Sequence, residues 1–427
     1  MLNTFNLKKT SFLIYGLGST GQSVIKYFKK KKVIDYQVWD DHIKFKNKNI
    51  KNLIRSLKKV DYIILSPGIS LQKTKYKKYL IKYKKKIITD IDLLYLSKKI
   101  NFKSIVVTGT NGKSTTCKII AHLLKKNKFN VEIGGNIGTP VLNLKIKKNI
   151  YLVIEASSFQ LSHSKFIHPN YAILLNITND HLDWHGSMPH YVNSKLKIFN
   201  FQTTNDLALI NNKFKNQFKK KRYLSKLINL KTKIYKKIRN KINNDYLKSN
   251  INDENMNFVY TLSKFLKISD KSFITSMNSF VGLPHRYEIF LKKKNIIFIN
   301  DSKATSFESS KFALASSKNI YWILGGLPKI KDKINLKDIK KNIIKSYIIG
   351  KNINFFKKQL NNKINYITTH NLKNSIIKIL QDIKLFKKEN NTILLSPSAA
   401  SFDQFKNFEN RGTEFKKLCK FYAKKYI

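Results

Sequence analysis

Short apolar runs alternate along this chain with longer segments in which apolar residues recur at helical spacing. Each run is followed by glycines or small polar residues, and the clearest runs cover residues 12–15, 62–65, 105–107, 151–154 and 171–175. Strands alternating with helices are typical of α/β domains built on parallel sheets. The pattern predicts three such domains, at residues 1–98, 99–283 and 284–427.

The first domain opens with "FLIYGLGSTG", in which Gly16, Gly18 and Gly21 follow a strand. Asp40 comes about twenty residues later, which is the spacing of a dinucleotide site with its phosphates at a helix N-terminus. The pattern fits NAD and fits equally any other phosphate-bearing ligand. In the third domain, polar residues follow the expected strands "NIIFIN", "IYWILGG", "SYIIG" and "NTILLS". Both domains are therefore expected to be Rossmann-like, with ligands at the carboxyl ends of parallel strands.

The second domain begins with "SIVVTGTNGKSTTCKIIAHLL", a strand, a glycine-rich turn and a helix expected to begin near Lys113. The usual phosphate loop reads G-x-x-x-x-G-K-S/T, whereas only two residues separate Gly109 from Gly112 here. Backbone amides, the helix dipole and Lys113 still converge on one point, and the Ser114 hydroxyl can reach Mg²⁺. The segment predicts a P-loop domain that binds a nucleotide.

Acidic residues follow two later strands of the second domain. Glu155 ends the strand "NIYLVIE", where P-loop proteins place a carboxylate that holds Mg²⁺ on phosphates. The strand "NYAILL" runs into "NITNDHLDWHG", which groups Asp180, His181 and Asp183. In a chain with few acids, this group predicts a ligand site.

Lysine and arginine number 83 against 25 aspartate and glutamate, a formal net charge of +58. Such an excess suggests a nucleic-acid surface, but the lysines are spread along the chain and arginine is scarce, as in a biased composition. We interpret the Lys/Asn-rich residues 211–250 as a solvated surface of the second domain, with a short nucleic-acid patch as the alternative. We expect no dedicated nucleic-acid partner, although the charge would attract small anions.

The two cysteines lack metal-site spacing, and the chain shows neither a secretion signal nor a long apolar run. These features predict a cytoplasmic protein without a membrane span, and we expect a monomer.

Several motifs occur in order along all three domains: "TGTNGKS", "GGNIGTP", "EASSFQL", "NDHLDWHG", "YVNSKLKIF", "PHRYE", "NDSKATS" and "LLSPSAASFDQFKNFENRGTEF". Together they resemble the Mur ligase family, and its D-glutamate-adding branch in particular. The resemblance implies a three-domain fold that binds a UDP-linked substrate, ATP and an amino acid in turn. It also implies an ATP-dependent ligase that adds D-glutamate to UDP-N-acetylmuramoyl-L-alanine through an acyl phosphate, for peptidoglycan. Ligands shared between the domains would require closure before chemistry.

The resemblance also assigns residue roles. ATP binding falls on Gly109, Thr110, Asn111, Gly112, Lys113, Ser114, Thr115, Asn255, Arg286 and Asp301. Binding of the UDP-muramoyl substrate falls on Ser19, Thr20, Gly21, Ser66, Asn136, Gln160 and His181, and binding of D-glutamate on Thr305, Lys329, Ser401 and Phe408. Catalytic roles fall on Lys113, Glu155, His181, Lys195 and Lys303.

Two Mg²⁺ ions are implied in the same way. Ser114 and Glu155 would hold the first ion and His181 the second. Lys195 matches a lysine that takes up CO₂ as a carbamate, which replaces a cation by an anionic group able to hold Mg²⁺.

The chain departs from the family at three places. Asp41 and His42 stand where Thr-Arg is frequent, which puts the uracil contacts in doubt. Phe258 occupies the position expected to bring a second adenine-side asparagine beside Asn255. Leu327-Pro328 precedes Lys329.

Four alternatives remain at this stage. A sister ligase with another amino acid or a folate-type acceptor is the nearest of them. A P-loop ATPase stimulated by nucleic acid would show a steep salt dependence of binding. A nucleotide sensor without catalysis and an NAD oxidoreductase are further alternatives, and the retained Lys113, Glu155, His181 and Lys195 argue against the sensor.

Overall fold

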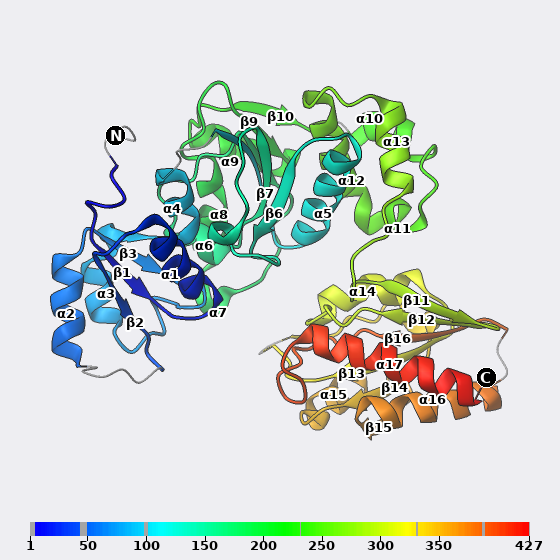
Figure 1. Cartoon of the computed structure of the whole chain (residues 1–427). Coiled ribbons are helices and arrows are strands. Elements are labelled where there is room, and N and C mark those ends of the chain that lie inside the picture. The colour runs from blue at the N-terminus through cyan, green and yellow to red at the C-terminus, as the bar shows by residue number, and fades with distance from the viewer. Residues whose placement is uncertain are drawn as a thin grey trace. The chain divides into compact units, whose positions relative to one another are not determined.

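The computed structural model describes residues 5–42, 49–97, 101–230, 232–329, 332–386 and 389–426. The chain forms two compact units, unit 1 (Met1–Phe280) and unit 2 (Val281–Ile427). Three sheets carry these units, two in unit 1 and one in unit 2, as the predicted three-domain α/β fold requires (Figure 1).

The first sheet of unit 1 is parallel throughout, with the strand order β2-β1-β3-β4. Its strands are β1 (Phe12–Tyr15), β2 (Tyr36–Trp39), β3 (Tyr62–Leu65) and the unpredicted β4 (Ile87–Ile88). The helices of this part are α1 (Ser19–Lys31), α2 (Ile50–Lys59), α3 (Lys77–Lys82), η2 (Lys84–Lys86) and α4 (Asp90–Leu96). The glycine-rich turn lies between β1 and α1, at the carboxyl end of the sheet.

The second sheet is also parallel, in the order β10-β9-β8-β5-β7-β6. Its strands are β5 (Phe102–Thr108), β6 (Val131–Gly135), β7 (Ile150–Glu155), β8 (Tyr171–Leu174), β9 (Leu207–Ile210) and β10 (Lys226–Asn229). The helices among them are α5 (Lys113–Lys126), η3 (Val141–Asn143), α6 (Ser158–His163), α7 (Leu182–His185), α8 (Met188–Leu196), η4 (Lys197–Phe199), η5 (Asn212–Phe214) and α9 (Lys215–Lys220). The strand β5 lies between β7 and β8, so the phosphate loop after β5 is flanked by the ends of both.

Residues 211–250 are more ordered than the sequence interpretation as a solvated surface allowed. They contain β10 and part of a helical layer, and Phe218, Tyr235, Ile242 and Leu247 are buried. The layer continues to residue 278 as α10 (Thr232–Arg239), α11 (Asp245–Lys248), α12 (Asn250–Phe265) and α13 (Asp270–Asn278). Apolar residues at helical spacing on this layer are buried, and α12 and α13 pack against α5.

The two sheets of unit 1 share one hydrophobic core. Phe12 and Phe28 of the first part belong to the same buried cluster as Ile154 and Leu196 of the second. A carboxylate reinforces this junction, because Asp92 of α4 accepts hydrogen bonds from the Ser164 hydroxyl (2.6 Å) and from two backbone amides of residues 165–166. The predicted boundary between residues 98 and 99 lies outside the described residues. The domain limits therefore stay predictions.

Unit 2 contains a six-stranded sheet in the order β11-β12-β16-β13-β14-β15. Its strands are β11 (Glu288–Lys293), β12 (Ile296–Asn300), β13 (Ile320–Gly325), β14 (Ile343–Ile349), β15 (Tyr366–His370) and β16 (Asn391–Leu395). Its helices are α14 (Phe307–Ser316), η6 (Lys340–Asn342), α15 (Ile353–Leu360), α16 (Leu372–Phe386) and α17 (Phe408–Tyr426). The expectation of a parallel sheet is wrong at one edge, because β11 and β12 form an antiparallel hairpin. The two residues Lys294 and Asn295 between them are too few for the crossover that a parallel pair needs.

No helix in the described ranges is both long and apolar enough to cross a membrane.

Candidate active site

The phosphate loop contains a left-handed turn that favours glycine. Gly112 precedes α5 with φ +81°, and a Cβ atom there would lie 2.3 Å from Oδ1 of Asn255. The helix begins at Lys113, as the sequence predicted. The first amides of an α-helix have no intrahelical acceptor, so this N-terminus provides donors and a positive dipole end for phosphate.

Two lysines converge on the loop from different helices. Nζ of Lys113 donates to the carbonyl oxygens of Gly109 (2.9 Å) and Thr110 (2.7 Å). Nζ of Lys195, on α8, donates to the same Gly109 oxygen at 2.7 Å. Lys195 is 1% exposed, and burial followed by the charge of Lys113 lowers the pKa of its amine well below its usual range. The structure thus brings together two residues that the sequence placed in catalysis.

Glu155 links the loop to the rest of the site. It ends β7 opposite Val107 of β5 and is 2% exposed. Its Oε1 accepts a hydrogen bond from Nδ2 of Asn136 at 2.8 Å. Within the described part of the chain, its Oε2 is buried without a hydrogen-bond partner. A buried carboxylate oxygen left in this way is a fitting ligand for a cation.

The residues for a metal site are consistent with Mg²⁺ and substrate phosphates rather than with an all-protein cage. No three His, Cys, Asp or Glu side chains converge as a metal site in the described ranges. Mg²⁺ commonly binds through one or two carboxylates, phosphate oxygens and water. Glu155 and the Ser114 hydroxyl at the start of α5 fit that donor set.

His181 lies in a left-handed turn (φ +52°) before α7. Its Nε2 is 3.4 Å from Oδ2 of Asp180, and its ring packs against Phe159 with the centroids 4.7 Å apart. The charge of Asp180 also acts on Lys195, which places this turn near the lysine. Tyr191 connects the phosphate loop to Lys195, because its hydroxyl is 2.9 Å from that of Thr110 and its ring centroid lies 4.6 Å from Nζ of Lys195.

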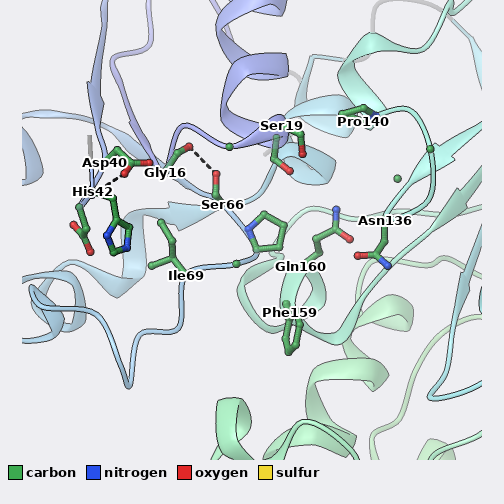
Figure 2. Close-up of a pocket in the computed structure, with 17 residues that line it drawn as sticks. Gly16, Ser19, Asp40, His42, Ser66, Ile69, Asn136, Pro140, Phe159 and Gln160 are labelled. Atoms are coloured by element: carbon green, nitrogen blue, oxygen red, sulfur yellow. Dashed lines mark hydrogen bonds between the residues drawn. The ribbon is translucent and has the colours of Figure 1, made fainter. Parts of the chain in front are cut away.

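A pocket of about 530 Å³ opens between the two sheets of unit 1 (Figure 2). Five of the residues predicted for the UDP-muramoyl substrate line it, namely Ser19, Thr20, Ser66, Asn136 and Gln160. Figure 2 shows Ser19 and Ser66 on the first-sheet side, and Asn136 and Gln160 on the second-sheet side. Gly21 and His181 are not lining residues of this pocket. Gly21 instead packs against the Gly16 carbonyl, where a Cβ would lie 2.0 Å from the oxygen.

Asp40 holds the glycine-rich turn. Its Oδ2 accepts from the amide of Leu17 (2.8 Å) and its Oδ1 from the amide of His42 (2.9 Å). Both carboxylate oxygens therefore bind backbone of this chain, whereas a dinucleotide site uses this acid to bind a ribose hydroxyl. This geometry argues against the NAD interpretation. Asp41 and His42, the two departures from the family pattern, both line the pocket.

On the adenine side, the structure shows where Phe258 and Asn255 lie. Phe258 is completely buried in the core, so its side chain is not available to a nucleotide. Asn255 lies against Gly112, and its Nδ2 donates to Oδ1 of Asn252 at 3.1 Å. The sequence interpretation missed Asn252, although the spacing N-x-x-N was visible in "NDEN". It also missed Asn176, Glu254 and Arg411.

In unit 2, most residues predicted for nucleotide and D-glutamate lie after β12, β13 and β16 and at the start of α17, whereas Arg286 lies two residues before β11. Nζ of Lys303 lies 4.1 Å from the ring centroid of Phe408. Asp301 accepts from the Ser396 hydroxyl (2.7 Å) and the Tyr287 amide (3.1 Å), and burial raises the pKa of this carboxyl to about 7. The binding roles of Arg286, Thr305, Lys329 and Ser401 stay predictions.

Arg411 is buried and connects two loops at these strand ends of unit 2. It is 1% exposed and donates to the Ser302 hydroxyl (3.0 Å) and to the carbonyls of Ser302 (2.8 Å) and Ala399 (2.9 Å). One guanidinium therefore ties the loop after β12 to the loop after β16. A single arginine in a basic chain gives no periodic signal, so sequence reasoning could not separate it from the others.

Comparison with known proteins agrees with this fold. Residues 107–280 match the Mur ligase middle domain. A UDP-N-acetylmuramoylalanine–D-glutamate ligase of Rickettsia felis is 37% identical over 440 residues, covering 95% of this chain and 96% of the relative. The ligase of the same name from Wolbachia of Brugia malayi is 35% identical over 489 residues, covering 98% and 97%.

The chain belongs to the Mur ligase family. Within that family, the relatives that it matches over nearly its whole length are UDP-N-acetylmuramoylalanine–D-glutamate ligases. Mur ligases are ATP-dependent enzymes that form C–N bonds, and the chain is an enzyme of this class. The fold also resembles a solved MurF ligase from Thermotoga maritima in complex with ADP, with a TM-score of 0.59 at 15% identity over 99% of this chain and 97% of that one.

Proposed function

We propose that this enzyme joins D-glutamate to UDP-N-acetylmuramoyl-L-alanine with conversion of ATP to ADP and phosphate, in the synthesis of peptidoglycan precursors. The position of Glu155 carries the proposal. Through β7 it is registered with the strand that leads into the phosphate loop, and through Asn136 it contacts the wall of the 530 Å³ pocket. One carboxylate thus joins a nucleotide site to a site sized for a second ligand. The names of the relatives supply the identity of the acceptor and the donor.

In this proposal the pocket binds the UDP-muramoyl substrate. Ser19 and Thr20 begin a thirteen-residue helix whose first turn can receive the diphosphate. Ser66 donates to the Gly16 carbonyl at 2.7 Å and fixes the glycine turn. Gln160 and Asn136 face the pocket from the second sheet, toward the sugar-peptide end.

Activation of the acceptor carboxylate would take place at the phosphate loop. Lys113 and the first amides of α5 would bind the phosphates of ATP, and the γ-phosphoryl group would pass to the carboxylate to give an acyl phosphate. Mg²⁺, when bound by Ser114 and Glu155, supplies positive charge that offsets repulsion between the carboxylate and the phosphates. Lys113 and Lys303 would neutralise further negative charge. The amine of D-glutamate then attacks the acyl carbon, and inorganic phosphate leaves.

A second Mg²⁺ near His181 and a carbamate on Lys195 are part of the same proposal. Burial and the charge of Lys113 lower the pKa of the Lys195 amine, which favours the neutral, nucleophilic form relative to a solvated lysine. Addition of CO₂ to that amine forms an N–C bond and releases one proton. The product is an anion with two oxygens, which would hold a bound Mg²⁺, whereas the ammonium form would repel it.

D-Glutamate binding is proposed for the strand ends of unit 2, by Thr305, Lys329, Ser401 and Phe408. A lysine and two hydroxyls match the two carboxylates of this substrate. We further propose a monomer in the cytoplasm, where ATP and UDP-linked precursors are available.

The test is phosphate release by the purified protein with ATP, Mg²⁺ and UDP-N-acetylmuramoyl-L-alanine, with D-glutamate, L-glutamate or no amino acid. The proposal expects release that requires both substrates and prefers D-glutamate. Release that ignores both substrates and rises with added nucleic acid would overturn it.

A further inference from the structure

Asn176 lies two residues after the end of β8 and forms hydrogen bonds with the backbone of the phosphate loop, much as a neighbouring strand would. Its carbonyl oxygen accepts from the amide of Thr110 at 2.8 Å. Its side chain then pairs with both backbone groups of Asn111, because Oδ1 accepts from the Asn111 amide (2.9 Å) and Nδ2 donates to the Asn111 carbonyl (3.3 Å). One asparagine therefore fixes three consecutive peptide units of the loop, those between Gly109 and Gly112.

Glu254 in turn fixes Asn176. It lies on α12, and its Oε2 accepts from Nδ2 of Asn176 at 3.1 Å. Its Oε1 accepts from Nδ2 of Asn211, the residue after β9, at 2.8 Å. The carboxylate thus bridges the ends of two neighbouring strands, β8 and β9.

We propose that Glu254, acting through Asn176, is a positioning residue that sets which backbone amides of the loop face the nucleotide. The inference rests on the proposed use of this loop for ATP. The amides of Thr110 and Asn111 are directed to Asn176, away from a bound phosphate. The anion site is then made by the amides that follow, at Gly112 and in the first turn of α5. Rotation of any of the peptide units that Asn176 binds would move Gly112. The strained φ of Gly112 leaves it little freedom to adjust.

The residue type supports a geometric role. A carboxylate near the loop opposes the binding of anionic ATP, so charge alone would disfavour glutamate at this position. Two asparagine amides point at Glu254, and only a carboxylate offers an acceptor to both of them. A glutamine would offer one acceptor and would turn its own N–H groups toward the other donor.

The neighbouring acid provides a matched control. Asp253 precedes Glu254 on α12, but its Oδ1 pairs with Nε of Arg239 at 2.7 Å, on another side of the helix. Asp253→Asn therefore removes the same charge from the same helix without touching Asn176.

The experiment measures ATP binding by calorimetry and steady-state kinetics for four variants. Glu254→Gln is expected to raise the Kd and KM for ATP about tenfold, with a smaller change in kcat. The reason is that one of the two hydrogen bonds between the Glu254 carboxylate and the asparagine amides is lost. Asp253→Asn should stay within about twofold of the wild type. Asn211→Asp alone sets two carboxylates against each other and should also weaken ATP binding.

The double variant Glu254→Gln/Asn211→Asp restores the pattern with reversed polarity, since the glutamine introduced at position 254 can accept from Asn176 and donate to the new carboxylate. It should recover ATP affinity to within about threefold. A Glu254→Gln effect no larger than that of Asp253→Asn, or a double variant no better than Glu254→Gln, would overturn the inference. Unchanged binding of UDP-N-acetylmuramoyl-L-alanine in each variant would establish that the fold is intact. A wild-type protein that binds no ATP would overturn the proposed function and this inference together.

Discussion

Lys113 and Lys195 donate to one and the same acceptor, the carbonyl oxygen of Gly109, at 2.9 and 2.7 Å. Two ammonium groups that share a buried acceptor repel each other, and the loss of hydration cannot be offset by a single carbonyl. The more buried amine, that of Lys195, therefore carries the lowered pKa. Because its pKa is lowered, Lys195 loses its proton more readily than a solvated lysine, and the neutral amine is the form that reacts as a nucleophile.

Lys195→Ala should lose most ligase activity, and small carboxylates such as formate or acetate should restore part of it by occupying the space of the carbamate. The measurement is phosphate release with and without added carboxylate. Lys197→Ala is the matched control, since Lys197 is also partly buried with a lowered pKa, but its Nζ donates to Ser162. Full activity of Lys195→Ala, or a loss that no carboxylate affects, would contradict the carbamate.

Glu155→Gln should separate activity from stability. Activity should fall on the order of 100-fold, with a higher Mg²⁺ requirement, because the oxygen proposed to hold the cation loses its charge. Thermal stability should change little, because Oε1 can still accept from Asn136 and the cost of burying the charge is removed. Mg²⁺ titrations of activity and a melting curve give both quantities. A large drop in melting temperature would indicate a structural role for the carboxylate instead.

Gly112→Ala should be more damaging than Gly186→Ala. The two glycines have nearly equal φ angles, +81° and +80°, so the cost of a left-handed alanine, about 1–2 kcal/mol, is common to both. Only at Gly112 does the new Cβ meet an obstacle, 2.3 Å from Asn255 Oδ1, whereas nothing lies within 4 Å at Gly186. Unfolding free energies and ATP affinities of the two variants test this difference. Equal effects would mean that Asn255 moves aside without cost.

The stability of unit 1 should depend on pH through Asp90. Burial raises the pKa of this carboxyl to about 6 from its ordinary 3.8, so the folded state binds more protons than the unfolded state between these values. Its contribution is therefore complete below about pH 4 and is lost as the pH rises through about 6. Asp90→Asn should remove that loss, changing the difference in unfolding free energy from wild type by about 3 kcal/mol between pH 4 and 7.5. Denaturant titrations across that range measure it, and a difference independent of pH would contradict the assignment.

Periodicity predicted the strands whose residues are apolar on both faces, such as β5, β7 and β13, because burial in a parallel sheet leaves a continuous apolar run. It missed β4, which has two residues, and β11, whose exposed and half-buried positions carry lysine and glutamate. The strands β6, β9, β10 and β15 were also not predicted. It also missed the buried side of residues 211–250, where the lysine-rich composition masked the helical spacing of the few apolar residues.

The site was predictable where chemistry lies next to a motif in the sequence. Lys113 was found because it follows the glycine-rich loop after β5, and Glu155 because it is the last residue of an apolar strand, β7. Asn176, Glu254 and Arg411 act through contacts between segments that are distant in sequence, up to 109 residues for Arg411 and Ser302, and such contacts leave no local pattern. The sequence likewise could not show that Asp41 and His42 line a pocket, because the pocket forms between segments that are distant in sequence.

The core shared by the two sheets of unit 1 determines how this chain can be divided. A cut near residue 98 would leave Phe12 and Phe28 on one fragment and Ile154 and Leu196 on the other, with apolar surfaces open to water and to aggregation. A cut near Val281, which is 98% exposed, falls where the two compact units separate. For domain exchange among ligases of this family, the transferable module is therefore residues 1–280 as one piece, with its pocket between the two sheets, and residues 281–427 as the other.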